Sequence, residues 1–264
     1  MRFDTAQPLM SALVGGNVQI ADYTALPITF NSMQRSKTSL YFLTVLYEDQ
    51  KHPISYLIVP PGTPSGFQVV DLKGKRVGIL PTVAYKVWFE KILYNSGIDP
   101  ASVQVLPIAP SLTPTAIRSG QVDALFTNDP AATAVLKQGF GKLLSNRVEV
   151  PEVLGGKFVF GSFNITKDYA DKNPDIALKV VHALDRAVEF VNAHQQTSKS
   201  IMKEFVHPSQ QPYVASYPDA NFKPSFSVSP KEFQVIADKY HKIGIIKKPI
   251  QVESLILSDQ SFKN

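Results

Sequence analysis

SLTPTAIRSGQVDALFTNDP, residues 111–130, has the pattern of a short helix, a glycine that ends it, a buried strand and a polar loop. Thr113 can cap the helix, and Pro114 suits its first position because that N–H would be unpaired anyway. Gly120 suits the left-handed backbone conformation that commonly ends a helix. Residues 122–126 then form an apolar run of strand length. The polar residues after this strand lie where ligands bind in open α/β sheets, at the carboxyl ends of the strands.

The same order of features occurs earlier in the chain, in residues 8–27. When Gly16 is aligned with Gly120, the apolar positions around the two glycines match as well. Two interpretations remain open. Any two helix–glycine–strand units can look alike by chance, or the chain contains two related α/β lobes that each present one polar loop to a shared cleft.

The composition excludes several classes of site. The chain has 264 residues and no cysteine, so disulfides, thiolate metal ligands and cysteine nucleophiles are all excluded. The net charge is +5, but lysine and arginine are scattered and form no basic stripe with interleaved aromatic residues. We therefore expect no nucleic-acid partner and only a mild preference for anionic ligands. No apolar run reaches the length of a membrane span.

Motifs for catalysis and cofactor binding are also missing. The sequence lacks the nucleophile-elbow, Walker A, dinucleotide-binding and zinc-protease patterns. Its five histidines show no spacing typical of metal ligands. The sequence therefore predicts no catalytic residue, no metal site and no cofactor.

Strand and helix patterns alternate through the middle of the chain. Residues 60–66 hold three prolines and two glycines, which indicates a linker and a domain boundary. Beyond it, a strand at 76–80, a helix that begins after Thr82 and a strand at 103–108 predict a parallel sheet. Residues 148–156 show no regular pattern.

The last third of the chain is predicted to be mostly helical. Asn173 can cap a long amphipathic helix, and Ser229 begins a capping box with Pro230 at the first helical position. Between these helices, residues 211–228 read as a loop region.

Three polar features can contribute to a ligand site. Thr82 begins a helix directly after a strand, and the unpaired N–H groups at such a helix start attract anions. The pairs Tyr23–Thr24 and Asn128–Asp129 follow the two strands of the repeated pattern. Each feature also has a simpler explanation, because Thr82 and Asp129 can be ordinary helix caps. Among the aromatic residues of the helix after Thr82, Tyr85 is the better ligand candidate, although a core position would suit it too.

The sequence resembles the substrate-binding proteins of ABC transporters, in the group that carries nitrate, aliphatic sulfonates, taurine and pyrimidine precursors of thiamine. The resemblance covers nearly the whole chain and rests on the order and spacing of five motifs. These motifs are residues 3–27, 71–78, 121–130, 173–175 and 244–246.

This resemblance implies a type II periplasmic-binding-protein fold, with two Rossmann-like α/β lobes joined by a hinge. Residues 1–66 and 159–264 would form lobe 1, and residues 67–158 would form lobe 2. Carried over by position, the implied ligand-binding residues are Tyr23, Thr24, Thr82, Val83, Tyr85, Asn128, Asp129 and Phe163.

The resemblance also implies a function. The protein would be a monomeric receptor that delivers a small ligand to an ABC permease in the membrane when its lobes close by a hinge motion. The ligand would be a sulfonate, nitrate, another small anion or a pyrimidine-type compound. The receptor would reside in the periplasm or be anchored to the cell envelope. We expect a signal sequence and the first part of lobe 1 to be missing, because no signal-peptide pattern or strand precedes the helix at residue 8.

The sequence departs from the family pattern at two positions. Gln19 stands where the family usually has an acidic residue, and Leu80-Pro81-Thr82 lacks the glycine that commonly precedes the hydroxyl residue.

Two other functions stay open. One is an enzyme on the same fold, such as a thiamine-pyrimidine synthase or a menaquinone-pathway enzyme. The other is the sensory ligand-binding domain of a larger protein.

Overall fold

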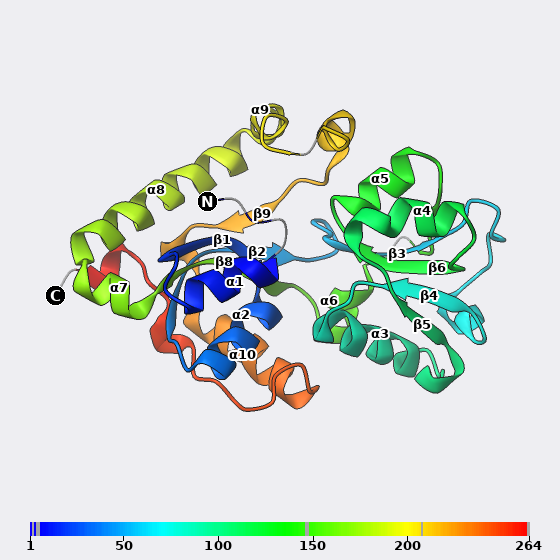
Figure 1. The fold of residues 1–264 in the computed structure, drawn as a ribbon, viewed down its shortest axis with the longest axis horizontal. Helices are drawn as coiled ribbons and strands as arrows, with labels where there is room; N and C mark the ends of the chain where they lie inside the picture. Colours follow the sequence, from blue (N-terminus) through cyan, green and yellow to red (C-terminus); the bar gives the residue numbers. More distant parts are fainter. Residues whose placement is uncertain (2, 4–5, 146–147, 207, 263–264) are drawn as a thin grey trace. The chain divides into compact units, whose positions relative to one another are not determined.

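The computed structural model describes residues 1, 3, 6–145, 148–206 and 208–262. The chain forms two compact units, each with its own β-sheet and its own helices (Figure 1). Unit 1 comprises residues 1–48, 158–195 and 220–264, and unit 2 comprises residues 49–157 and 196–219. Helices and strands alternate in both units, which confirms the expected α/β class.

Unit 1 is built on a four-stranded sheet of order β1-β8-β2-β9, whose neighbouring strands are all antiparallel. Its helices and strands are α1 (Ala6–Val14), β1 (Ile20–Ala25), α2 (Leu26–Ser36), β2 (Leu40–Glu48), β8 (Phe158–Thr166), α7 (Lys167–Lys172), α8 (Pro174–Ala193), β9 (Asn221–Lys223) and α10 (Pro230–Lys242), with short 3₁₀ turns η5 (Ser225–Ser227), η6 (Glu253–Leu255) and η7 (Asp259–Phe262).

The sheet of unit 1 is buried on both faces. Successive residues of a strand point to opposite faces, and β2 illustrates this at Phe42 and Leu43. Phe42 packs in an aromatic cluster with Phe30 of α2 and Phe233 of α10. Leu43 packs with Val181 of α8 and other apolar residues on the opposite face.

Unit 2 is built on a five-stranded sheet of order β5-β4-β6-β3-β7. Its helices and strands are β3 (Ser55–Val59), β4 (Arg76–Ile79), α3 (Val83–Asn95), β5 (Gln104–Pro107), α4 (Thr113–Arg118), β6 (Ala124–Asn128), α5 (Ala131–Lys137), β7 (Lys142–Leu143), α6 (Glu149–Leu154) and α9 (Gln195–Met202), with 3₁₀ turns η1 (Val69–Leu72), η2 (Pro100–Ser102), η3 (Pro110–Leu112) and η4 (Gln211–Ser216).

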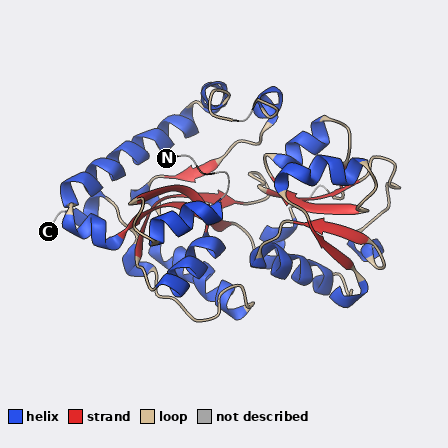
Figure 2. Ribbon diagram, viewed as in Figure 1, coloured by secondary structure: helices blue, strands red, loops and turns tan. Residues whose placement is uncertain are grey.

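Helices cover both faces of the unit 2 sheet (Figure 2). In β6, Leu125 packs with Ala132 and Val135 of α5, while the next residue, Phe126, packs against Phe89 of α3. This two-sided burial explains why residues 124–126 are apolar without alternation.

The predicted parallel sheet is confirmed for β4, β5 and β6, and the sheet of unit 2 contains two further strands, β3 and β7, that the prediction did not include. β4 is parallel to both β5 and β6, but β3 is antiparallel to β6 and β7. The helical crossovers that join β4, β5 and β6 favour parallel pairing, whereas β3 is joined to its neighbours by other connections.

The division between the units also differs from the expected boundaries. Residues 49–66 belong to unit 2, because β3 pairs with β6 in that sheet, with Tyr56 opposite Thr127. Residues 196–219 belong to unit 2 as well. The proline-rich stretch at 60–66 is therefore a loop inside unit 2, because strand pairing decides a domain boundary and proline content indicates only a loop.

Local signals for helix ends are confirmed at several positions. Gly16 and Gly120 both adopt left-handed conformations, with φ of 79° and 71°, after α1 and α4.

Two local predictions of secondary structure are wrong. Thr113 lies inside α4 after the turn η3, and its hydroxyl donates to Ala109 O at 3.3 Å instead of capping the helix. Residues 149–154 form the helix α6 instead of an irregular segment.

Candidate functional site

Unit 2 brings two of the predicted ligand features to one edge of its sheet. β4 and β6 are adjacent and parallel, with Val77 opposite Ala124 and Ile79 opposite Phe126. Their carboxyl ends therefore lie side by side. Thr82 follows β4, Asn128 is the last residue of β6 and Asp129 comes directly after it, so these residues share the edge at which α/β sheets bind ligands.

Thr82 is the N-cap of α3, as predicted. Its hydroxyl accepts a hydrogen bond from Tyr85 N at 3.2 Å. Val83 is the first residue of α3, and its side chain is 50% exposed. The first N–H groups of this 13-residue helix and its dipole together favour a negatively charged group at this end.

Tyr85 lies in the core of unit 2. It is 4% exposed, and its ring packs against Trp88 at 5.3 Å and Phe126 at 4.8 Å between ring centroids. These contacts fix the orientation of the start of α3 relative to β6. Its proposed contact with a ligand stays a prediction.

Asp129 forms a partly buried anchor in the loop between β6 and α5. Its Oδ1 accepts hydrogen bonds from Thr133 N at 2.9 Å and from Thr133 Oγ1 at 2.6 Å. Burial raises the pKa of Asp129 above its ordinary value of 3.8, although hydrogen bonds from Thr133 and Tyr56 act in the opposite direction. The side chain of its neighbour Asn128 is also partly buried.

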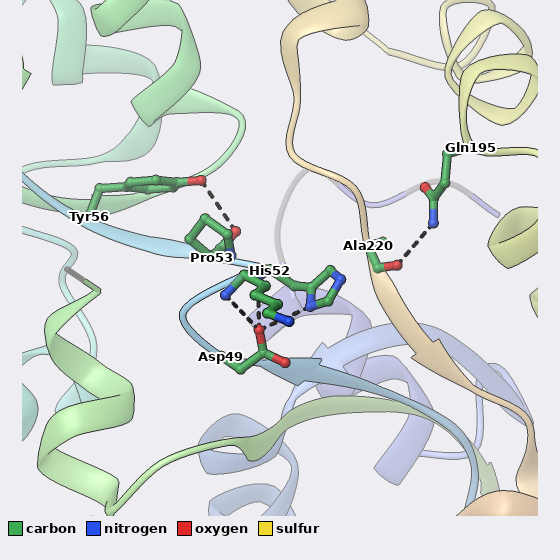
Figure 3. A network of polar contacts seen from close by, with 7 residues as sticks. Asp49, His52, Pro53, Tyr56, Gln195 and Ala220 are labelled. Carbon is green, nitrogen blue, oxygen red and sulfur yellow. Dashed lines mark hydrogen bonds and ion pairs between the residues drawn. The ribbon is translucent and has the colours of Figure 1, made fainter. Parts of the chain in front are cut away.

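Two tyrosines that the sequence analysis did not select lie near Asp129. Tyr56, on β3, lies close enough to Asp129 to oppose the rise in the pKa of its carboxyl group. The Tyr56 hydroxyl donates to Pro53 O at 3.2 Å (Figure 3). Tyr217 follows η4; burial and then the charge of Asp129 raise its pKa to about 12. No sequence motif indicates this grouping, because its members come from three separate segments.

The pKa of Asp129 leads to a prediction about stability and pH. The native state holds the Asp129 proton at pH values where the unfolded chain has already lost it. Stability therefore falls as the pH rises from 3.8 through the raised pKa. Asp129→Asn keeps an oxygen for the two Thr133 hydrogen bonds and removes this titration. Urea unfolding of both proteins across this range is expected to show a widening advantage for Asp129→Asn. A constant difference would contradict the prediction.

A polar turn follows the point at which the chain enters unit 2. Asp49 Oδ1 accepts hydrogen bonds from Lys51 N at 2.8 Å and His52 N at 2.9 Å, and contacts His52 Nδ1 at 2.9 Å (Figure 3). Burial raises the pKa of Asp49, but these His52 and Lys51 interactions outweigh it and hold the pKa below its usual value. The turn thus fixes the backbone immediately before β3.

In unit 1, Thr24 belongs to a buried polar network. Its hydroxyl lies 2.8 Å from the Thr29 hydroxyl and accepts a hydrogen bond from Asn164 Nδ2 at 2.8 Å. Ser162 Oγ donates to Asn164 Oδ1 at 2.9 Å, and all four side chains are buried. The network ties β1 to β8 and α2, so the present role of the Thr24 hydroxyl is to hold these elements together.

Tyr23 is held between aromatic rings of the same unit. Its ring stacks on Phe160 with a centroid distance of 6.4 Å and meets Phe222 edge-on at 6.3 Å. Gly161 allows this close packing, because a Cβ there would lie 2.6 Å from Tyr23 Cζ and would overlap Thr24 O.

Gly161→Ala is therefore expected to displace β1 and to lower the free energy of unfolding by about 1–3 kcal/mol. Urea unfolding would measure this loss. Gly66→Ala is a suitable control because a Cβ at Gly66 would meet no atom within 4 Å. Equal stability of the two variants would show that β1 accommodates the extra methyl group.

Phe163 faces away from the buried polar network. It packs against the apolar cluster that includes Ile165 and Val181 of α8. β1 and β2 each form a bulge opposite Phe163. Ser162 and Asn164 are two residues apart on β8, but their partners are three residues apart on β1 and on β2. The contact of Phe163 with a ligand stays a prediction, as do those of the other selected residues.

The described residues contain no cluster of three or more histidine, cysteine or acidic side chains that could hold a metal ion. None of the helices in this part of the chain combines the length and apolar character of a membrane span.

Comparisons with known proteins connect the chain to binding proteins. The NMT1-like family matches residues 65–205, more than half of the chain. The taurine-binding periplasmic protein of Escherichia coli K12 is 25% identical over 230 residues, which cover 86% of this chain and 61% of that protein. The chain thus spans less than two thirds of that relative. A putative aliphatic sulfonates-binding protein of the same organism is 22% identical and is aligned over 97% of this chain and 78% of its own length.

Solved structures show the same fold. The periplasmic aliphatic sulphonate binding protein SsuA from Escherichia coli has a TM-score of 0.74 at 21% identity, covering 99% of this chain and 87% of that one. The fold also occurs in an enzyme: the desulfurization enzyme DSZB has a TM-score of 0.63 at 12% identity, covering 90% and 82%.

Proposed function

Because the chain belongs to the NMT1-like family, we propose that it is the solute-binding component of an ABC importer. It would act as a monomer in the periplasm or at the cell envelope and deliver a small ligand to a membrane permease. The names of two curated relatives, a taurine-binding and an aliphatic sulfonates-binding protein, support a sulfonate ligand. Closure of two lobes on the ligand, which the family resemblance implies, stays a prediction.

The observation that carries this proposal is the sheet edge at the carboxyl ends of β4 and β6. There the N-terminus of α3, capped by Thr82, supplies N–H groups and a positive dipole end for the sulfonate. Asn128, the last residue of the adjacent strand β6, and Asp129 lie at the same edge. Val83 and Asn128 would complete the contacts of this edge, and Tyr23 of unit 1 stays a predicted ligand-binding residue.

Isothermal titration calorimetry can test this function. The panel would contain ethanesulfonate, taurine, nitrate, a small carboxylate and a pyrimidine, with sodium chloride as the control for ionic strength. We expect at least one sulfonate to bind with one-to-one stoichiometry and a dissociation constant below about 0.1 mM. Binding of the pyrimidine alone, or of no compound by a folded sample, would contradict the proposal.

The fold shared with DSZB keeps an enzymatic function as the second candidate. Mass spectrometry of each bound compound after prolonged incubation separates the two. A receptor returns the ligand unchanged, whereas an enzyme converts it. We expect unchanged ligand, because the sequence contains neither a cysteine nor a nucleophile-elbow, Walker A, dinucleotide-binding or zinc-protease motif.

A further inference from the structure

We propose that a basic surface on unit 1 binds the anionic phospholipid headgroups of a membrane. This basic surface consists of five exposed side chains: Arg35, Lys37, Lys242, Lys247 and Lys248. They come from the end of α2, from the end of α10 and from the segment that follows α10. The inference goes beyond the proposed function and does not depend on which ligand the protein carries.

Contacts between α2 and the segment after α10 bring these residues together. The two helices pack side by side in unit 1 (Figure 1). Asn31 Nδ2 donates a hydrogen bond to Ile245 O at 3.1 Å, and Gln34 Nε2 donates to Lys248 O at 2.6 Å. Arg35 follows Asn31 by one helical turn and therefore lies on the same face of α2. The last turns of α2 thus lie beside the segment that follows α10.

The other cations of the basic surface lie at the ends of the two helices. Lys37 follows α2 directly, and Lys242 is the last residue of α10. Ile245 N donates to Tyr240 O at 2.8 Å, so the chain turns sharply as it leaves α10. The five side chains therefore gather in the region where both helices end.

No acidic side chain neutralises these five cations. None of them forms an ion pair within the described part of the chain. Residues 6–21, 26–47 and 239–252, which carry or border the basic surface, contain no aspartate or glutamate. The neighbouring helix α7, whose Lys167 N donates to Ser39 O at 2.9 Å, has two aspartates, but each is paired with a lysine of α7 itself.

The basic surface accounts for the net charge of the whole chain. Without its five members, 22 of the 27 lysines and arginines remain, and this number equals the 22 aspartates and glutamates. Asp238 and Glu253 are the acidic residues nearest to Lys242 and Lys248 in the sequence, and the Asp238 carboxylate accepts a hydrogen bond from Gln234 Nε2 at 2.8 Å. The cations are scattered in the sequence, so folding concentrates the excess charge at one end of unit 1.

Helix stabilisation explains only part of this arrangement. Arg35 and Lys242 lie in the last turns of their helices, where a cation complements the helix dipole. Lys247 and Lys248 lie outside any helix. Lys37 has a left-handed backbone with φ of 59°, a conformation that a glycine would adopt with less strain. Stabilisation of helix ends therefore does not account for these three lysines.

The chemistry of the basic surface favours a broad anionic surface over a single small anion. Four of the five cations are lysines, whose ammonium groups are point charges on flexible stems and lack the planar fork that binds one phosphate in two places. All five side chains are exposed. Each exposed lysine or arginine adds separately to the attraction for a layer of anionic lipid headgroups.

The basic surface lies away from the predicted ligand residues of unit 1. Tyr23 and Thr24 precede the start of α2, whereas the basic surface lies at its end. A helix of 11 residues is about 16 Å long. Contact with a membrane at the basic surface therefore does not cover these two residues.

Co-sedimentation of the full chain with lipid vesicles tests the proposal. Vesicles of phosphatidylcholine with about 30% phosphatidylglycerol are compared with vesicles of phosphatidylcholine alone, at about 0.05 M sodium chloride. We expect at least about a hundredfold stronger partitioning onto the anionic vesicles. Most of this binding should disappear at about 0.5 M sodium chloride, because salt screens interactions between exposed charges.

The double variant Lys247→Gln with Lys248→Gln is expected to bind the anionic vesicles at least about tenfold more weakly, because each lysine contributes a factor of about five. The matched control is Lys73→Gln with Lys75→Gln, which removes two exposed lysines of unit 2 and lowers the net charge by the same amount. This control should stay within about twofold of the unmodified protein, because its charges lie outside the basic surface.

Lys37→Gly provides a test that a folding defect cannot imitate. Glycine relieves the strain of the left-handed backbone at this position, so urea unfolding should show a variant that is no less stable than the unmodified protein. Its partitioning onto anionic vesicles should nevertheless fall by about fivefold. Unchanged vesicle binding by this variant would contradict the proposal.

The remaining outcomes are also decisive. Equal partitioning onto both kinds of vesicle, or equal losses for the double variant and its control, overturns the proposal. Displacement by inorganic phosphate at an ionic strength where sodium chloride leaves the binding intact also overturns it, because that result indicates a site for one small anion. Calorimetry with sulfonates should be unaffected by Lys247→Gln with Lys248→Gln, so the proposed function is tested separately.

Discussion

Phe42→Ala is expected to lower the free energy of unfolding by about 3–5 kcal/mol, the largest effect of any substitution considered for this protein. Phe42 is 0% exposed, and its ring lies 4.7 Å from Phe233 and 5.8 Å from Phe30 between centroids. It therefore joins β2 to both α2 and α10. Truncation would remove these contacts and leave a cavity that the close-packed interior cannot fully fill.

Urea unfolding followed by circular dichroism measures this effect. Phe190→Ala is the matched control, because Phe190 is in the same unit, on α8, with 43% of its surface exposed. Its replacement is expected to cost less than about 1 kcal/mol. Similar losses for both variants would show that the aromatic contacts of Phe42 with Phe30 and Phe233 contribute no more to the stability of unit 1 than an exposed ring does.

Asp185→Ala is expected to cost about 2–4 kcal/mol. Asp185 is 6% exposed within α8, and its carboxylate accepts hydrogen bonds from Ser225 N at 2.6 Å and Ser225 Oγ at 2.7 Å. These bonds attach the turn η5 to α8. Alanine would leave both buried donors of Ser225 unsatisfied, and an unsatisfied buried donor costs more than the hydrogen bond itself contributes.

A double-mutant cycle with Ser225→Ala tests the mechanism. Ser225→Ala removes the hydroxyl but keeps the backbone N–H, so it should cost less than Asp185→Ala. The two substitutions should also be strongly non-additive, because they share an interaction. Asp185→Asn, which retains one acceptor oxygen, should fall between them. Additive losses would mean that Asp185 acts through contacts other than Ser225.

Much of the fold could be predicted from local patterns. Thr82 identified the start of α3, because its hydroxyl can cap the helix that follows β4. Gly120 marked the end of α4 because few other residues adopt a positive φ without strain. These signals depend only on the backbone and side chain of neighbouring residues, so they are readable without the tertiary structure.

Local patterns gave wrong predictions at positions where long-range contacts determine the secondary structure. Residues 149–154 form α6, which packs beside β3 and α3 although its sequence contains a proline. Thr113 resembles a cap, but the preceding turn η3 moves the helix start before it. Helix propensity predicts the structure poorly at such positions, because packing against residues distant in the sequence can outweigh it.

The sequence by itself determined the α/β class, the order of most helices and strands and the polar residues that end β4 and β6. Only the tertiary structure decided that β3 joins the sheet of unit 2, because strand pairing depends on partners some 70 residues away. It also decided that Tyr56, Asp129 and Tyr217 form one group, although they come from three separate segments. The raised pKa values of Asp129 and Tyr217 are properties of this grouping, because burial in the folded unit is the largest cause of both.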